Sequence, residues 1–245
     1  MKKTQHIRLF VNEKLLSGKE INLSDKDSHY LINVMRCMQG DNIRCFNASD
    51  GEFLAQITAG NKKKSIVKLL KQIRYPEEEK DIWLLFAPLK KDKTDFVVEK
   101  AVELGVSRIV PVLTKYTNTD KVKIERFEAQ AKEAAEQCER LSVPEISNMV
   151  ELKKLLDEWN KDRVLFFMDE RKKGTSATEA FKSGKGRPTA LLIGPEGGFA
   201  EEEAEMLTAC DFVKNVSLGP RILRAETAAI AALAVWQATE GDWKK

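Results

Sequence analysis

The chain has 245 residues, of which 42% are hydrophobic and 32% are charged, and its formal net charge is +3. This length and composition predict one large or two modest domains of an ordinary soluble protein and exclude a disordered chain. The longest apolar run, Ala228 to Trp236, has nine residues, and the apolar stretch near the N-terminus is shorter, so we expect neither a membrane-spanning helix nor a signal peptide.

The cysteine and histidine content argues against a metal cage or a disulfide framework. The chain has four cysteines, which lie far apart and form no CxxC pair, and only two histidines that could supplement them. The cysteines are Cys37, Cys45, Cys138 and Cys210. We therefore expect no bound metal and a location in the reducing cytoplasm.

Positive charge is concentrated in the first third of the chain. Residues 1–72 contain 13 Lys and Arg against 7 Asp and Glu, a net charge of +6, whereas residues 73–245 have a net charge of −3. The lysines that cluster there are Lys62, Lys63, Lys64, Lys68 and Lys71. Such a cluster favours a surface for a polyanion such as RNA, because phosphate neutralisation releases counterions. On charge alone, a solvated lysine-rich edge strand is an equal alternative.

The first 74 residues have the pattern of a small β domain. Short β-branched or aromatic stretches alternate with turns, and Asp50-Gly51 is typical of a tight hairpin turn. The expected strands are Ile7–Val11, Asn42–Asn47, Phe53–Thr58 and Ser65–Ile73. Together they predict a small barrel or sandwich.

One helix is expected between the first two of these strands. Capping residues occur from Leu23 to Asp27, and the apolar residues that follow have helical spacing. These apolar residues are Tyr30, Leu31, Val34 and Met35. The helix should cover an open end of the barrel. A proline and an acidic run from Arg74 to Lys80 then predict a linker between one domain, residues 1–74, and a second, residues 75–245.

From residue 81 the pattern changes to alternating strands and helices. The expected strands are Ile82–Ala87, Ile109–Leu113, Val164–Met168, Ala190–Ile193 and Val213–Ser217, and the expected helices are Asp92–Leu104, Ile124–Cys138, Glu151–Trp159, Glu201–Ala209 and Glu226–Thr239. This alternation predicts an α/β domain with a parallel sheet covered on both faces. The last helix is apolar nearly all round, so it should be buried in the core or against another subunit.

Two strand-to-helix loops are candidates for a ligand site. Gly194–Phe199, with the sequence GPEGGF, follows a buried strand, where α/β sheets bind ligands. It lacks a phosphate-loop lysine, and the carboxylate of Glu196 would repel phosphates, so a phosphate-poor ligand is expected. The alternative is a tight connection that needs glycine for conformational reasons.

The second loop, Ser217–Thr227, should lie beside the first and complete a pocket. Glu226 and Thr227 would fall near a helix N-terminus, where plain capping is the alternative to a functional role. Arg224 has apolar neighbours, and an arginine in such a place commonly binds an anion, a polarised carbonyl or a carboxylate.

These motifs resemble the bacterial small-subunit ribosomal RNA uridine N3-methyltransferases, a family of the SPOUT superfamily of knotted methyltransferases. The matching segments are GPEGGF at 194–199, LGPRILRAETAAIAAL at 218–233, KxxKxDFVVEKAVELGV at 90–106, AAEQCER at 134–140, RLFV at 8–11, HYLxxVMR at 29–36 and GD at 40–41. The resemblance covers about residues 6 to 240. Cys138 and Glu139 stand where many relatives have a small residue and glycine.

The resemblance implies a fold, a cofactor and partners that spacing alone does not indicate. Family members join a PUA-like β-barrel RNA-binding domain to a SPOUT trefoil-knot domain, act as homodimers, and use S-adenosylmethionine without a metal to methylate N3 of a uridine in 16S ribosomal RNA. The cofactor residues it implies are Leu192, Gly194, Glu196, Gly197, Gly198, Leu218, Leu223 and Thr227, with backbone groups reading the adenine. The residues expected to touch RNA are Arg8, His29, Arg36, Lys90 and Lys93. For Lys90 and Lys93 an exposed helix start is an equal alternative, and for His29 a satisfied surface histidine is one.

Methyl transfer to an imide nitrogen needs loss of the N3 proton and stabilisation of negative charge on the uracil carbonyls. We expect Arg224 and Arg140 to donate to the developing oxyanion or to grip the RNA backbone. Glu226 or Glu196 would accept the proton, directly or through water. Two other functions remain open, namely a SPOUT enzyme acting on another RNA position such as a ribose 2′-hydroxyl, and a noncatalytic RNA-binding assembly factor.

Overall fold

The computed structural model describes residues 6–60, 64–119, 121–171 and 174–243. The chain forms two compact units, residues 1–78 with 135–143, and residues 79–134 with 144–245. The first division lies four residues beyond the expected boundary at residue 74. Residues 135–143 belong to the first unit although they lie within the sequence of the second, and the sequence pattern does not predict this.

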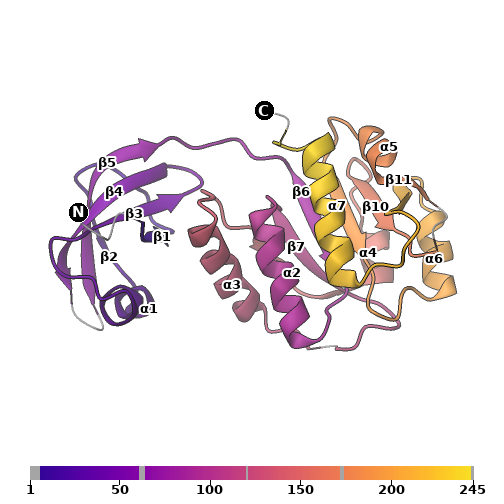
Figure 1. Ribbon diagram of the computed structural model, residues 1–245, viewed down its shortest axis with the longest axis horizontal. Helices are drawn as coiled ribbons and strands as arrows, with labels where there is room; N and C mark the ends of the chain where they lie inside the picture. Colours follow the sequence, from indigo (N-terminus) through magenta and orange to yellow (C-terminus); the bar gives the residue numbers. More distant parts are fainter. Residues whose placement is uncertain (1–5, 61–63, 120, 172–173, 244–245) are drawn as a thin grey trace. The chain divides into compact units, whose positions relative to one another are not determined.

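The first unit is built on one curved sheet (Figure 1). Within the described residues, five strands pair in the order β1-β3-β4-β5-β2, and only the β1 and β3 pair is parallel. The strands are β1 Arg8–Phe10, β2 Glu20–Asn22, β3 Asn42–Asn47, β4 Gly51–Gly60 and β5 Ser65–Arg74. Gly51 has φ +84 where the hairpin between β3 and β4 closes, which confirms the predicted turn. The core of this sheet includes the fully buried Ile43 and Leu69.

The described part of the lysine cluster lies on β5 and just before it. Lys64, Lys68 and Lys71 are exposed, whereas the predictions for Lys62 and Lys63 fall outside the described residues. The strand β5 pairs with β4 on one side, and its residues Ile66–Lys68 pair with β2 on the other. These residues therefore do not form an edge strand, so the alternative of a lysine-rich edge strand is wrong for them.

The predicted helix forms as α1, Asp25–His29, and continues as a π-helical turn, Tyr30–Val34. Ser24 caps α1 as expected, because its hydroxyl accepts the backbone N–H of Asp27 at 3.1 Å. Of the four apolar residues with helical spacing, Leu31 is buried, whereas Val34 and Met35 are exposed. The wider π turn, in which the Met35 N–H reaches the Tyr30 carbonyl, moves them off the face that a 3.6-residue period predicts.

A buried ion pair ties the returning segment 135–143 to the sheet of the first unit. Arg8 Nε lies 2.6 Å from Glu52 Oε1, and both side chains are almost fully buried. The remaining guanidinium nitrogens of Arg8 donate to the carbonyls of Ala135 and Arg140 at 2.8 and 2.9 Å. Arg8 is 3% exposed and uses these donors inside the unit, so a contact between Arg8 and RNA remains only a prediction.

Two further arginines hold the turn of this segment. Arg44 Nη2 lies 2.7 Å from Glu139 Oε1, and Arg74 Nη1 donates to the Glu139 carbonyl at 2.7 Å. The hydrogen bond to Arg44 and its charge hold the pKa of Glu139 below its ordinary value. Glu139 has φ +62, a backbone conformation that favours glycine.

The second unit contains a parallel sheet. Among its described residues the strand order is β11-β13-β10-β12-β6-β7-β8, with β9 also paired to β7. The strands are β6 Ile82–Phe86, β7 Arg108–Leu113, β8 Glu145–Ile146, β9 Val150–Glu151, β10 Val164–Met168, β11 Thr175–Ser176, β12 Thr189–Ile193 and β13 Val213–Ser217. The helices are α2 Lys91–Glu103, α3 Ile124–Gln137, α4 Leu152–Asp157, α5 Ala177–Lys182, α6 Glu201–Thr208 and α7 Ala225–Thr239. The last three residues of α3 belong to the first unit.

Every strand and helix predicted for residues 81–239 is present within a few residues of its expected ends. The additions are short, namely β8, β9, β11 and the six-residue helix α5. Strands of two residues are too short to show an alternating pattern. The linker is also confirmed in part, since residues 75–80 form neither helix nor strand.

Helices α2 and α7 lie side by side on the sheet (Figure 1). Gly105, with φ +80, ends α2 as predicted, and Gln237 Nε2 donates to the Leu104 carbonyl at 2.6 Å, which joins the end of α2 to α7. One side of α7 is buried, including Leu233 and Trp236. The opposite face, formed by Ile230, Ala231, Ala234 and Val235, stays half-buried.

Within the described ranges, none of the helices combines the length and the apolar character that crossing a bilayer requires. The same residues contain no group of three His, Cys, Asp or Glu side chains placed to hold a metal ion.

Candidate active site

Two adjoining cavities lie at the carboxyl ends of three neighbouring strands, β13, β10 and β12. Their volumes are about 240 and 50 Å³. The shared walls are Met168, Glu170, Ile222, Leu223 and Ala228. The larger cavity also touches Gly194, Glu196 and Arg224, and the smaller one touches Leu218 and Arg221. The two predicted loops therefore meet around one crevice, at the edge of the sheet where α/β folds bind ligands.

Close packing against side chains explains the three glycines of the first loop. A Cβ on Gly194 would lie 2.6 Å from the ring of Phe199, and one on Gly197 would lie 3.1 Å from Tyr116. Gly198 has φ +73, and its Cβ would lie 2.5 Å from Glu170 Oε1. That same oxygen accepts the Phe199 N–H at 3.0 Å. The glycines thus let the protein fold tightly on itself, and they shape the wall of the larger cavity.

Replacing Gly198 with alanine is expected to destabilise the second unit by about 2–4 kcal/mol, because a left-handed residue acquires a Cβ and that Cβ also collides with Glu170. Gly186 is a matched control, since it has φ +78 but a Cβ there would meet no described atom within 4 Å. Gly186→Ala should therefore cost only the conformational part, about 1–2 kcal/mol. Urea unfolding of both variants measures the difference. Equal losses in the two variants would refute the close approach.

A lysine joins the two loops through their carboxylates. Lys93 Nζ, from the first turn of α2, lies 3.5 Å from Glu196 Oε1 and 3.4 Å from Glu226 Oε1. Asn118, in the loop after β7, donates from Nδ2 to Glu196 Oε2 at 2.8 Å. The sequence predicts that Lys93 touches RNA, but the structure gives its ammonium group two carboxylate partners instead.

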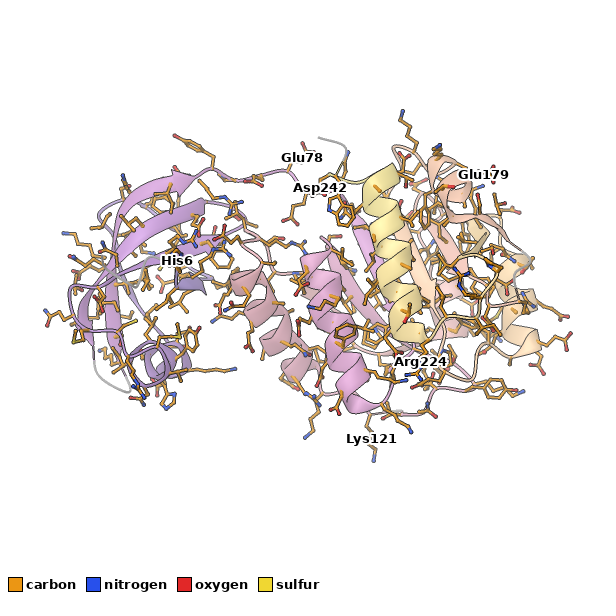
Figure 2. All side chains as sticks on the ribbon, in the orientation of Figure 1. His6, Glu78, Lys121, Glu179, Arg224 and Asp242 are labelled. Carbon is orange, nitrogen blue, oxygen red and sulfur yellow. The ribbon has the colours of Figure 1, made fainter. Side chains whose placement is uncertain are left out.

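Glu226 does not act as a plain helix cap. Its Oε2 is buried with no hydrogen-bond partner among the described residues, and its Oε1 faces Lys93. Thr227, the other expected acceptor, is exposed. Arg224 immediately precedes α7 and is exposed (Figure 2); within the part of the chain that the structure describes, its guanidinium group has no hydrogen-bond or ion-pair partner. Arg224 is therefore available to a ligand in the larger cavity.

The predicted cofactor residues fall into three groups. Gly194, Glu196, Gly198, Leu218 and Leu223 line the crevice. Gly197 packs on Tyr116, and Thr227 is exposed. Leu192 lies in the core of the sheet with no exposed surface, so a side-chain contact between Leu192 and a ligand is excluded by its burial.

Sequence reasoning missed the contribution of β10. Met168 and Glu170 line both cavities, and Asp169 lines the smaller one. Asp169 is fully buried and paired with Arg171 Nε at 2.8 Å. The position of β10 could have indicated this contribution, because its carboxyl end lies between those of β12 and β13, which carry the two predicted loops.

The other predicted residues lie elsewhere. Arg140 belongs to the first unit, where its carbonyl accepts from Arg8. Its predicted role, to donate to the developing oxyanion or to grip the RNA backbone, remains a prediction. His29 and Arg36 are exposed on the first unit, and Arg36 has φ +54. Lys90 is exposed at the start of α2.

The lining of the crevice fits S-adenosylmethionine. Met168, Ile193, Leu223 and Ala228 offer an apolar wall to the adenine, while the carboxylate of Glu170 suits a cationic sulfonium or ribose hydroxyls. A phosphate-binding loop is not needed, because this cofactor carries no phosphate.

Family models match both parts of the chain. An RNA methyltransferase domain matches residues 76–237, and an RNA methyltransferase PUA domain matches residues 23–70. The chain is 36% identical to ribosomal RNA small subunit methyltransferase E of Rickettsia conorii, with 93% of each chain covered. It is 32% identical to the protein of that name from Bacillus subtilis, over 90% of this chain and 91% of the relative.

Solved structures show the same fold over nearly the whole chain. Ribosomal RNA small subunit methyltransferase E of Neisseria gonorrhoeae, bound to S-adenosyl methionine, is 27% identical with a TM-score of 0.84, over 97% of this chain and 99% of that one. A Legionella pneumophila protein in complex with the same cofactor is 30% identical with a TM-score of 0.86, over 96% and 98%. The chain therefore belongs to the ribosomal RNA small subunit methyltransferase E family and has its predicted fold class, a SPOUT trefoil-knot domain with a parallel sheet preceded by a PUA-like domain.

Proposed function

We propose that this protein transfers a methyl group from S-adenosylmethionine to N3 of a uridine in 16S ribosomal RNA of the small subunit. The observation that carries the proposal is the crevice between the two loops. Arg224, which has no partner among the described residues, lines this crevice, and Lys93 links the carboxylates of Glu196 and Glu226 beside it. The names and the bound cofactor of the relatives support the same assignment.

The cofactor is held by the walls that the two loops and β10 provide. Apolar side chains, among them Leu218 and Leu223, enclose the adenine, and backbone groups of the Gly194 loop read its edge. When bound, S-adenosylmethionine supplies an electrophilic methyl group on a sulfonium sulfur. Glu170 faces this positive charge, and Arg221 suits the carboxylate of the methionine part.

Arg224 donates to a uracil carbonyl, on which negative charge grows as N3 loses its proton. Glu196 lines the cavity and accepts that proton, while Glu226 shares the lysine and has an oxygen without a partner among the described residues. One N3–C bond forms as the S–CH₃ bond breaks, and the N3 proton passes to the carboxylate pair. The products are 3-methyluridine and S-adenosylhomocysteine.

Lys93 positions the two carboxylates, so Lys93→Met is expected to lower kcat about 10–100-fold, because correct placement of a proton acceptor contributes about 10²–10⁴ in rate. The affinity for S-adenosylmethionine should stay within threefold. Lys100→Met is the matched control, because Lys100 lies on the same helix and also binds two carboxylates, Glu99 and Glu103, at 2.7 and 2.8 Å. Steady-state methyl transfer measures both variants. A similar kcat for the two would contradict the positioning role.

The proposal extends to the partners and the location of the protein. The exposed lysines on and beside β5, together with His29 and Arg36, would supply RNA-binding groups on the PUA-like domain. The half-buried apolar face of α7 and the exposed Phe96 of α2 suit contact with a second copy in a homodimer. A ribosomal RNA substrate implies action in the cytoplasm.

A reverse-transcription assay tests the site of methylation. A methyl group on N3 blocks the Watson–Crick edge, so ribosomal RNA from cells that contain the protein should stop the polymerase at one uridine, and RNA from cells lacking it should not. Methylation of a ribose 2′-hydroxyl leaves that edge free and would give full read-through at ordinary nucleotide concentrations. Read-through in both samples would overturn the N3 assignment.

A further inference from the structure

A third cavity lies in the second unit, beside the glycine loop and separate from the two cavities of the crevice. Its volume is about 290 Å³, and it opens between the loop that follows β6 and the loop that follows β7. The walls are Pro88, Leu89, Lys90, Thr94, Asp95, Asn118, Thr119, Lys121, Val122, Lys123, Arg126 and Phe127. Because β6 and β7 are parallel neighbours, this cavity lies at the same edge of the sheet as the cofactor crevice.

The described lining of this cavity carries a net positive charge. Among its described residues, four cations face one carboxylate, Asp95, which is already paired with Arg126. Within the described residues, the ammonium groups of Lys90, Lys121 and Lys123 have no ion-pair partner. Figure 2 shows Lys121 pointing away from the ribbon. Uncompensated lysines around a hollow attract a phosphate group.

The neutral part of the lining suits the rest of a nucleotide. Thr119 and Asn118 provide hydroxyl and amide groups of the kind that hydrogen-bond sugar and phosphate oxygens. The hydroxyl of the buried Thr94 is already paired with the backbone of Leu89. Leu89 and Phe127 are buried apolar side chains that form a floor. This combination distinguishes the cavity from a bare lysine patch.

One side chain connects this cavity to the cofactor crevice. Asn118 lines the cavity and donates to Glu196 at 2.8 Å, and Glu196 lines the crevice. Lys90 lines this cavity, and Lys93, three residues further along, lies 3.5 Å from Glu196 of the crevice. A nucleotide seated here would therefore adjoin the nucleotide whose base enters the crevice.

We propose that this cavity, which we call the β6–β7 pocket, binds the phosphate and ribose of an RNA nucleotide next to the target uridine. The proposal rests on the proposed function, because it takes RNA as the substrate. Lys121 and Lys123 hold the phosphate, and Asn118 joins the wall of the pocket to Glu196 through its hydrogen bond.

The test is the double variant Lys121→Ala with Lys123→Ala, compared with Lys153→Ala and Lys154→Ala, which removes two exposed lysines from α4. Binding of each protein to isolated small subunits is measured at several salt concentrations. The pocket variant should bind at least tenfold more weakly, and its slope of log K against log salt should become less steep by about 1, because the two lysines neutralise one phosphate. Its affinity for S-adenosylmethionine should be unchanged, and the control should match the wild type.

Equal binding and equal salt slopes for the pocket variant and the control would overturn the proposal. If wild-type protein bound subunits but transferred no methyl group, the proposed function would fail, and the comparison of the two binding slopes would still decide whether the β6–β7 pocket binds RNA. Thermal unfolding of both variants confirms that each is folded before binding is compared.

Discussion

Replacing Glu52 with glutamine is expected to lower the free energy of unfolding of the first unit by about 3–5 kcal/mol. Removing one partner of a buried ion pair leaves the other charge uncompensated, and this costs more than the intact pair contributes. Glu52 Oε1 lies 2.6 Å from Arg8, and Arg44 and Arg74 approach the same carboxylate within 3.6 and 3.5 Å. Three cations therefore lose their shared counter-charge.

The matched control is Glu77→Gln. Glu77 lies 2.9 Å from the same Arg74, but its side chain is 60% exposed, so the loss should be within about 0.5 kcal/mol. Chemical unfolding measures the difference, and hydrogen exchange follows the segment 135–143. The Glu52 variant should speed exchange in that segment, because Arg8 no longer holds the carbonyls of Ala135 and Arg140. Equal stability of the two variants would show that the buried cluster does not hold the segment.

Arg224→Ala is expected to lower kcat for methyl transfer about 10²–10³-fold, the usual effect of removing an oxyanion donor. Arg224 lines the larger cavity and has no partner among the described residues, so it is ready to donate to the substrate. Affinity for S-adenosylmethionine should change less than threefold, because the proposed contact is with the uracil.

Arg224→Lys separates the charge of this residue from its geometry. Lysine keeps the positive charge but loses the planar fork of donors, so it should restore part of the rate and not all of it. Single-turnover methyl transfer with saturating cofactor measures all three proteins. A rate within threefold of wild type for Arg224→Ala would exclude the assigned role.

The general architecture could be predicted from the sequence because apolar periodicity is a local property. The strand Val164–Met168 and the strand Val213–Ser217 have the predicted ends, and Gly105 ends its helix as expected. The π turn after His29 escaped prediction, because its wider winding alters which side chains face the core without changing the composition. Short strands such as β2 were not predicted, because three residues are too few to show an alternation of apolar and polar side chains.

Residues of the site could be predicted only where a single stretch of sequence has an unusual composition. The loops at Gly194 and Ser217 stand out by their glycines, and Arg224 stands out among apolar neighbours. The sequence around Lys93 suits a residue that contacts RNA. It does not show that the carboxylates of Glu196 and Glu226, which are distant in sequence, lie within 3.5 Å of the Lys93 ammonium group. Arg8 likewise has the local pattern of a surface residue, since its partner Glu52 is 44 positions away.

Nucleoside mass spectrometry after methyl transfer in vitro tests the central claim most directly. Small subunits from cells that lack this protein are incubated with the purified enzyme and labelled S-adenosylmethionine, and their RNA is digested to nucleosides. We expect label in 3-methyluridine with wild-type protein and a loss of about 10²–10³ in its rate of appearance with Arg224→Ala. Label in a different methylated nucleoside, or none in RNA despite measurable cofactor binding, would contradict the assignment.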